Sequence, residues 1–352
     1  MLSLEGINIL DFSTLLPGPM ASLILAEAGA NVIKVERPNI GDDMRHYPPM
    51  DGEDSACFKL LNRGKTSIAL DLKDVDSLEK LRPLIENSDI IIEQFRPGVM
   101  DRLGLGYDAM KALNPAIIYC SITGYGQTGP DADRAGHDLN YIAETGLLSL
   151  SGDDKGKPQI PPGLIADIGG GAYPAVMNIL LALRLVEKTG EGSYLDISMS
   201  DNLFPWMFWA QAQMQTAGTT PTAGGELLSG GSPRFQIYET ADNRYLAAAP
   251  LEEKFWQIFC SIIGITDTKS ATIQNVAAII KIKTSNDWQN LFQNQDLCCS
   301  IVRTLDEALA HPHFKTRGLF PQNHDGLSPL PTPLAPVFKN KTNTAPKLGS
   351  HD

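Results

Sequence analysis

The chain contains few of the residues that build metal sites and disulfide frameworks. Its 352 residues include 5 cysteines and 6 histidines. The cysteines form no CxxC pair, and Cys298 and Cys299 are adjacent, which is a poor arrangement for a structural disulfide. Neither a zinc site nor a disulfide-stabilised secreted domain is therefore indicated. Reduced thiols in a cytoplasmic protein are the expected state.

Long apolar runs and a strong positive charge are also missing. No run of about 18 apolar residues is present, so no membrane-spanning helix and no membrane partner are expected. The first residues, MLSLEGINIL, have no basic segment and no small-residue cleavage site, so no secretory signal is expected. The formal net charge of -12 argues against a nucleic-acid partner.

The usual phosphate-binding loops are absent as well. The turn LLPGPMAS lacks the lysine of a P-loop, and no GxGxxG follows the first predicted strand. A nicotinamide-binding site of the common kind is therefore disfavoured, and no prosthetic group is expected. Basic residues are nevertheless present, and several of them follow or flank predicted strands, where either a phosphate-bearing ligand or a solvated basic surface is compatible with the pattern. These basic residues are Lys34, Arg37, Arg63, Lys65, Lys73, Arg96 and Arg102.

Short apolar segments rich in β-branched residues alternate with helical segments through the first 125 residues. This alternation favours a doubly wound parallel sheet, which binds ligands at the carboxyl ends of its strands. A further strand is predicted over 193–201, and a long apolar helix follows Asp167 and ends at Gly190. The strands expected before these are 7–12, 31–38, 66–72, 89–95 and 116–124.

The composition changes after about residue 200, and a second domain is expected there. Residues 1–200 are assigned to a large α/β domain, and 201–224 to a linker that includes an aromatic helical patch. Residues 225–310 are assigned to a smaller α+β domain with a hairpin over 234–250, turning at Asp242 and Asn243. The proline-rich segment 311–352 is expected to run extended and to return to the large domain or to a partner subunit.

Two short segments place an ionisable side chain beside glycine: RAGHDLNY, with His137, and LIADIGGG, with Asp167. A carboxylate before a helix is often an N-cap, and an isolated histidine is often a surface or core residue. Together they would form a candidate acid/base pair. Their glycines would leave the backbone open to close approach by a ligand. Sequence spacing alone does not bring the two residues together.

Several stretches in order resemble the class III CoA-transferase superfamily, also called CaiB/BaiF. They are VIKVERP, NRGKTSIALDLK, RPGVMDRLGLGYD, NPAIIYCSITGYGQTGP, AGHDLNY, IADIGGG and GEGSYLDISM. Within it the chain resembles the alpha-methylacyl-CoA racemase branch, through AGHDLNYIAETGLLS, LLSGGSPRFQIYETADNRYLAA, LEEKFW and DEALAHPHFKTRG. The transferase branch usually lacks the histidine of GHD, so the racemase branch is the closer match.

The resemblance implies a role for each matching residue. His137 and Asp167 match the two catalytic bases, and Glu252 matches a glutamate that supports the histidine. The backbone N–H of Asp138 matches the group that meets the thioester oxygen. Residues expected to contact the acyl-CoA are Arg37, Ala69, Leu70, Asp71, Leu72, Arg96, Arg102, Gly136, Leu139, Asn140 and Tyr141. Coenzyme A is then part of the substrate, and the family implies an interlocked homodimer.

The resemblance therefore implies an isomerase of acyl-CoA or lipid metabolism that epimerises Cα of a 2-methylacyl-CoA through an enolate. Two groups on opposite faces of Cα would remove and return the proton. The alternative is a CoA-transferase in which Asp167 is the nucleophile and forms a mixed anhydride and then an aspartyl-CoA thioester. A binding protein that lost turnover is disfavoured by the presence of His137, Asp167 and Glu252.

Overall fold

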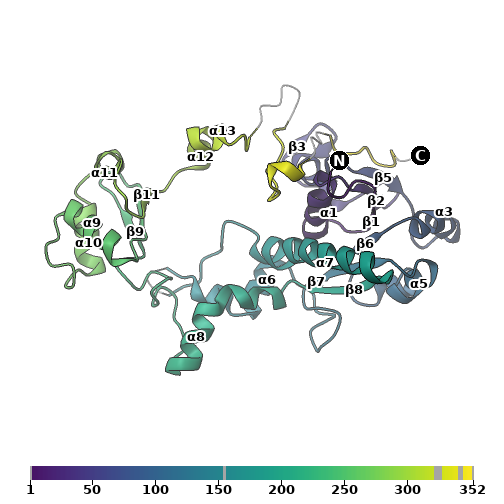
Figure 1. Cartoon of the computed structure of the whole chain (residues 1–352), viewed down its shortest axis with the longest axis horizontal. Helices are drawn as coiled ribbons and strands as arrows, with labels where there is room; N and C mark the ends of the chain where they lie inside the picture. Colours follow the sequence, from purple (N-terminus) through teal and green to yellow (C-terminus); the bar gives the residue numbers. More distant parts are fainter. Residues whose placement is uncertain (1, 154–155, 321–326, 340–343, 351–352) are drawn as a thin grey trace. The chain divides into compact units, whose positions relative to one another are not determined.

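A six-stranded parallel sheet forms the centre of the first of two units in the computed structural model of the chain (Figure 1). The structure describes residues 2–153, 156–320, 327–339 and 344–350. The strand order β5-β2-β1-β6-β7-β8 runs outward from the middle in both directions, as in doubly wound folds. The predicted fold class is confirmed. The strands are β1 (Asn8–Asp11), β2 (Asn31–Glu36), β5 (Thr66–Ala69), β6 (Ile90–Glu93), β7 (Ile118–Thr123) and β8 (Ser193–Ser198).

Each of these strands lies within its predicted range, because β-branched runs bounded by turn residues mark buried parallel strands clearly. Leu10 and Ile91 join an apolar cluster with α3 (Val75–Glu86) and α5 (Tyr107–Leu113) on one face of the sheet. Since side chains alternate along a strand, their neighbours point to the other face. There α1 (Pro17–Glu27) and α7 (Tyr173–Thr189) pack against the strands and each other (Figure 1).

Shorter elements complete the first unit. The helices α2 (Ala56–Asn62), α4 (Val99–Arg102) and α6 (Asp138–Glu144) and the pair β3 (Met50–Asp51) and β4 (Asp54–Ser55) connect the sheet strands. The chain's last segment also belongs to this unit. Within it, the carbonyl of Thr344 accepts the N–H of Gly64 at 2.8 Å, and the N–H of Gly349 donates to Ser67 Oγ at 3.2 Å.

The second unit contains residues 146–160 and 207–318. A three-stranded antiparallel sheet of order β11-β10-β9 packs with the helices around Trp256 and Trp288. The predicted hairpin is present, and Asn243 adopts the positive φ of 58° that its turn requires. The elements are α8 (Phe208–Ala217), β9 (Gln236–Glu239), β10 (Tyr245–Ala248), α9 (Glu253–Ile263), α10 (Ile273–Ile280), α11 (Ser285–Phe292), β11 (Cys299–Ile301), α12 (Leu305–Ala310) and α13 (Pro312–Thr316).

The observed units differ from the predicted domain bounds in four places. Residues 146–160 group with the smaller unit, and so does 207–224, which was predicted as a linker. Residues 201–206 group with the larger unit, and the return to the larger unit begins at 319. Part of the predicted C-terminal segment, at 321–326, 340–343 and 351–352, lies outside the described residues.

The helical run Ala166–Thr189 is long and apolar enough to cross a membrane by length and composition alone, whereas the sequence predicts no such helix. One face of it packs on β7, β8 and α1.

Candidate active site

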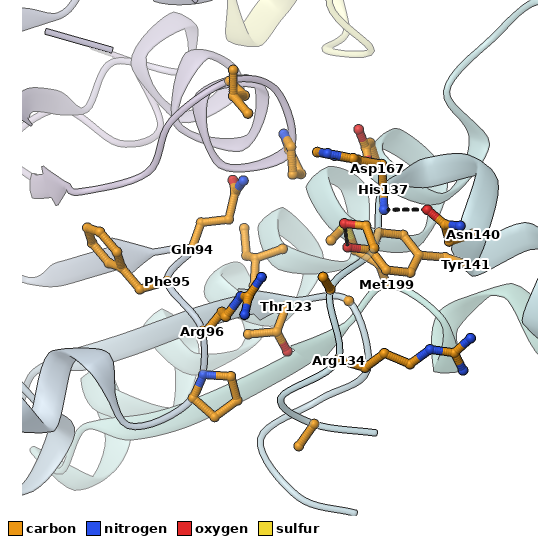
Figure 2. Close-up of a pocket in the computed structure, with 18 residues that line it drawn as sticks. Gln94, Phe95, Arg96, Thr123, Arg134, His137, Asn140, Tyr141, Asp167 and Met199 are labelled. Carbon is orange, nitrogen blue, oxygen red and sulfur yellow. Dashed lines mark hydrogen bonds between the residues drawn. The ribbon is translucent and has the colours of Figure 1, made fainter. Parts of the chain in front are cut away.

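A pocket of about 440 Å³ opens in the first unit at the carboxyl ends of β1, β6, β7 and β8. This is the edge at which parallel sheets bind ligands, and the strand order reverses there between β1 and β6. Figure 2 shows Gln94, Phe95 and Arg96 on one side of the pocket and His137 and Asp167 on the other. The lining is Leu15, Pro17, Gln94, Phe95, Arg96, Pro97, Ile122, Thr123, Gly124, Ala132, Arg134, Ala135, Gly136, His137, Asn140, Tyr141, Asp167 and Met199.

His137 reaches the pocket from the residue that precedes α6. Its backbone is extended, with φ of -130° and ψ of 176°, and serves as the N-cap of that helix. The backbone N–H of His137 donates to Asn140 Oδ1 at 3.0 Å (Figure 2). The first turn of α6 therefore fixes the backbone of His137. The imidazole side chain is exposed and lines the pocket.

Asp138 joins the histidine segment to the aspartate segment. Its side chain is only 6% exposed, and its Oδ1 accepts the backbone N–H groups of Ala166 at 2.7 Å and Asp167 at 3.0 Å. The residue that follows His137 thus anchors the peptide of Asp167. This contact helps to bring the two predicted bases into the same pocket, although they are 30 positions apart in the sequence.

Asp167 lies inside a one-turn π-helix, Ala166–Ala172, that continues into α7. The N-cap interpretation of Asp167 is therefore wrong, because the residue before it, Ala166, is already helical. Such π-turns are rare and often occur at functional sites. Burial is the main cause that raises the pKa of the Asp167 carboxyl to about 7, and the charge of Asp138 raises it further. A carboxyl group with this pKa exists in both protonation states near neutral pH.

The glycines after Asp167 serve internal packing. A Cβ on Gly170 would stand 2.3 Å from the carbonyl oxygen of Met199, and one on Gly169 would stand 2.3 Å from the Trp206 ring. A Cβ on Gly171 would crowd Pro17 and Met199. None of the three lines the pocket. The expectation that they leave room for a ligand is therefore wrong, because protein atoms occupy that space.

Gly136 is also required by its neighbours. A Cβ there would lie 2.7 Å from the Tyr141 ring, and the Tyr141 hydroxyl donates to the Gly136 carbonyl at 2.5 Å. Unlike the other three glycines, Gly136 does line the pocket. The pKa of Tyr141 is raised to about 12, first by burial and then by the charge of Asp167, so the phenol remains a hydrogen-bond donor.

Several pocket residues were not predicted from the sequence. Thr123 ends β7, and Leu15, Gln94, Arg134 and Met199 come from segments that follow strands; a position at or after a strand's carboxyl end is the signal that would have identified them. The Thr123 hydroxyl is buried without a hydrogen-bond partner within the described ranges, which is uncommon for a buried polar atom. A polar group of a bound ligand would satisfy it.

The remaining predicted site residues of the first unit lie outside the pocket lining. Arg37 pairs with Asp43 at 2.5 Å and both side chains are about half exposed, while Arg102 ends α4. Ala69 ends β5, and Leu70, Asp71 and Leu72 follow it. Leu139 is exposed on α6. Glu252 belongs to the second unit, where it is the N-cap of α9.

Replacing Asp138 tests the link between the two segments. Asp138→Ala removes the acceptor for two buried N–H groups, so we expect a loss of about 1–3 kcal/mol in unfolding free energy, measured in urea. Asp138→Asn retains an acceptor oxygen and removes the charge, so we expect most of the stability to remain and the pKa of Asp167 to fall below about 7. Carboxyl ¹³C NMR titration measures that pKa. An unchanged Asp167 pKa in Asp138→Asn would show that the charge of Asp138 does not raise the pKa of Asp167.

Comparison with known proteins identifies the family of the whole chain. The model of CoA-transferase family III matches residues 4–352. The chain is 32% identical over 368 residues to alpha-methylacyl-CoA racemase of Homo sapiens, covering 99% of this chain and 91% of that one. It is 32% identical over 377 residues to succinate–glutarate CoA-transferase of Agrobacterium fabrum, covering 99% and 93%. The crystal structure of a CAIB/BAIF family protein from Brucella suis superposes with a TM-score of 0.88 at 28% identity, covering 99% and 97%.

Proposed function

The chain belongs to CoA-transferase family III, and from this premise we propose that it epimerises Cα of 2-methylacyl-CoA thioesters. The observation that supports this choice is the presence of a second titratable group, His137, in the pocket that contains Asp167. Acyl transfer through an aspartyl intermediate has no evident need for that imidazole. Inversion of a carbon centre does need two groups, one on each face.

The proposed reaction moves one proton off the substrate and returns one proton to it. A neutral imidazole of His137 removes the α-proton, and the C–H electron pair becomes the enolate. The protonated carboxyl of Asp167 then donates its proton to the opposite face of Cα. For the other enantiomer the roles reverse. The raised pKa of Asp167 supports this scheme, because the same carboxyl must donate in one direction and accept in the other near neutral pH.

The other residues are proposed to hold and polarise the thioester. The backbone N–H of Asp138 would donate to the enolate oxygen, since the first N–H groups of a helix have no intrahelical acceptor. Glu252 would support the imidazole. Thr123 offers the bound ligand a hydroxyl that has no hydrogen-bond partner in the described part of the chain. The proposed contacts to CoA remain Arg37, Ala69, Leu70, Asp71, Leu72, Arg96, Arg102, Gly136, Leu139, Asn140 and Tyr141.

CoA transfer between carboxylic acids is the second candidate. Its support is the equal identity, 32%, to a named CoA-transferase. In this reaction the Asp167 carboxylate would attack the thioester carbonyl and expel CoA as a thiolate. The thiolate would then attack the Asp167 carbonyl of the anhydride and release the acyl group as its carboxylate. The acceptor acid would repeat these steps in reverse.

A single incubation separates the two candidates. A panel of 2-methylacyl-CoAs is held with the protein in deuterated water, with and without succinate, and analysed by mass spectrometry. Epimerisation predicts deuterium at Cα without any need for succinate and without succinyl-CoA. Formation of succinyl-CoA without α-deuterium would contradict the epimerase proposal and support the transferase.

We also propose that the chain functions as an interlocked homodimer. The support from this structure is an apolar face of α7 that the described residues leave exposed; it includes Met177, Leu181 and Leu185. Leu181→Glu is expected to raise the dimer dissociation constant at least about tenfold, because it would bury a charge in the contact. Light scattering after size exclusion measures this change, with Lys188→Glu on the same helix as the control. A monomeric unmodified chain at micromolar concentration would contradict the proposal.

A further inference from the structure

Leu15 has a backbone conformation that leucine rarely adopts. Among the described residues, four non-glycine residues have positive φ, and three of them are asparagines: Asn39, Asn243 and Asn294. Asparagine tolerates the left-handed region, whereas leucine is disfavoured there. Leu15 is the exception, with φ of 63°. It is also the only one of the four that lines the pocket.

A buried carboxylate holds this conformation. The N–H of Leu15 donates to Asp42 Oδ1 at 3.0 Å, and the same oxygen accepts the N–H of Met44 at 2.9 Å. The other oxygen, Oδ2, pairs with Lys34 Nζ at 2.9 Å, and neither of these two side chains is exposed. Lys34 Nζ in turn donates to the carbonyl of Ser13 at 2.6 Å. Asp42 therefore fixes the loop both directly and through Lys34.

The same loop is anchored at both of its ends. Before Leu15, the N–H of Ser13 donates to Asp11 Oδ1 at 2.9 Å, and Asp11 is fully buried beside Lys65. After Leu15, the N–H of Gly18 donates to Oε1 of the pocket residue Gln94 at 2.9 Å. These buried charges have no part in the proposed proton transfers. Their shared effect is to fix the turn between β1 and α1 against the pocket.

We propose that Asp42 is a positioning residue that holds Leu15 in its strained conformation, and that the Leu15 side chain determines how tightly the pocket binds a CoA thioester. The nature of the ligand rests on the proposed function. A glycine would adopt this φ without strain, but it has no side chain to place in the pocket. Glycine would adopt this backbone conformation with less strain than leucine. The presence of leucine therefore indicates that its side chain has a role in the pocket. Strain of this kind persists only where the surroundings hold it.

Hydrogen exchange tests the positioning without any ligand. Exchange followed by mass spectrometry reports the amides of residues 13–18 in the unmodified chain, in Asp42→Ala and in Asp42→Asn. We expect exchange at least about tenfold faster in Asp42→Ala, because the Leu15 N–H loses its acceptor, and a smaller change in Asp42→Asn, which retains an oxygen. The control is Glu27→Gln, which breaks another buried ion pair, to Arg63, away from this loop. Equal acceleration in Glu27→Gln and Asp42→Ala would overturn the proposal, as would no acceleration in Asp42→Ala.

Calorimetric titration with isobutyryl-CoA tests the consequence for binding. Asp42→Ala and Leu15→Gly are each expected to weaken binding about tenfold, and the double variant no further, because both changes remove the same side chain from the pocket. Glu27→Gln should bind normally. Additive losses in the double variant would overturn the role of Leu15. Should the unmodified chain not bind isobutyryl-CoA, the proposed function fails, while the exchange experiment still decides the role of Asp42.

Discussion

Asp167→Asn is expected to lower the rate of α-proton exchange by about 10²–10⁴-fold, because the amide cannot donate and accept the proton that the carboxyl carries. The change is nearly isosteric, so the pocket and its affinity for acyl-CoA should be retained. Mass spectrometry of an acyl-CoA incubated in deuterated water measures the exchange. The same variant should also lose any CoA transfer, since an amide is not a nucleophile for that reaction. Full exchange in Asp167→Asn would remove the residue from the mechanism.

The same substitution is expected to change stability in a direction set by pH. Folding raises the pKa of Asp167 from its ordinary value of 3.8 to about 7, so the folded protein binds more protons than the unfolded chain between these values. The unfolding free energy contributed by this group therefore falls as pH rises from about 4 through about 7. Asparagine carries no such penalty. We expect Asp167→Asn to be more stable than the unmodified chain by about 1–3 kcal/mol at pH 8. This gain is smaller than the free energy that corresponds to the whole pKa shift, because the Asp167 side chain is partly exposed.

Urea unfolding at pH 5 and pH 8 measures this difference. The gain in unfolding free energy from Asp167→Asn should be small at pH 5 and larger at pH 8. A gain of equal size at both values would mean that burial of the ionised carboxylate is not its source. A residue whose removal stabilises the fold and abolishes the reaction is present for its chemistry, which is the usual compromise at catalytic sites.

The sequence predicted the parallel sheet well because its signal is local. Each strand is a short apolar run with turn residues on both sides, and the helices between them carry their own periodicity. Features set by neighbours distant in the sequence were not predicted. The strand β11 pairs with β10 across about 50 residues, and its three residues carry little pattern of their own. The helix α10 was also missed, because its run IQNVAAII is short and apolar on most sides.

The candidate site was predictable in its residue types but not in its construction. Family resemblance identified His137 and Asp167, and the pocket contains both. Nothing in the sequence indicated that the carboxylate of Asp138 would accept two N–H groups from the other segment, since hydrogen bonds between distant residues leave no periodic trace. The glycines illustrate the opposite error. Three of them were assigned to ligand approach, whereas Met199 and Trp206 fill the adjacent space.

His137→Ala is the substitution expected to separate the two candidate reactions. Epimerisation requires a base on each face of Cα, so loss of the imidazole should lower α-proton exchange by about 10²–10⁴-fold. Acyl transfer through Asp167 requires one nucleophile, so any succinyl-CoA formation should remain within about threefold of the unmodified chain. His137→Gln is the matched variant, because it retains side-chain volume and hydrogen bonding without a group that titrates near neutral pH. Exchange and transfer are measured in the same incubation with deuterated water and succinate.

The decisive quantity is the ratio of the two rates, because a general disturbance of the pocket would lower both together. The backbone of His137 is held by Asn140, so neither variant removes the hydrogen bond that begins α6. A selective loss of exchange in both variants would assign His137 to proton transfer at Cα. An equal loss of exchange and transfer would assign it to binding or orientation of the thioester. Exchange that survives in both variants would leave Asp167 as the sole base, and a single base returning the proton to the face it left cannot invert the centre.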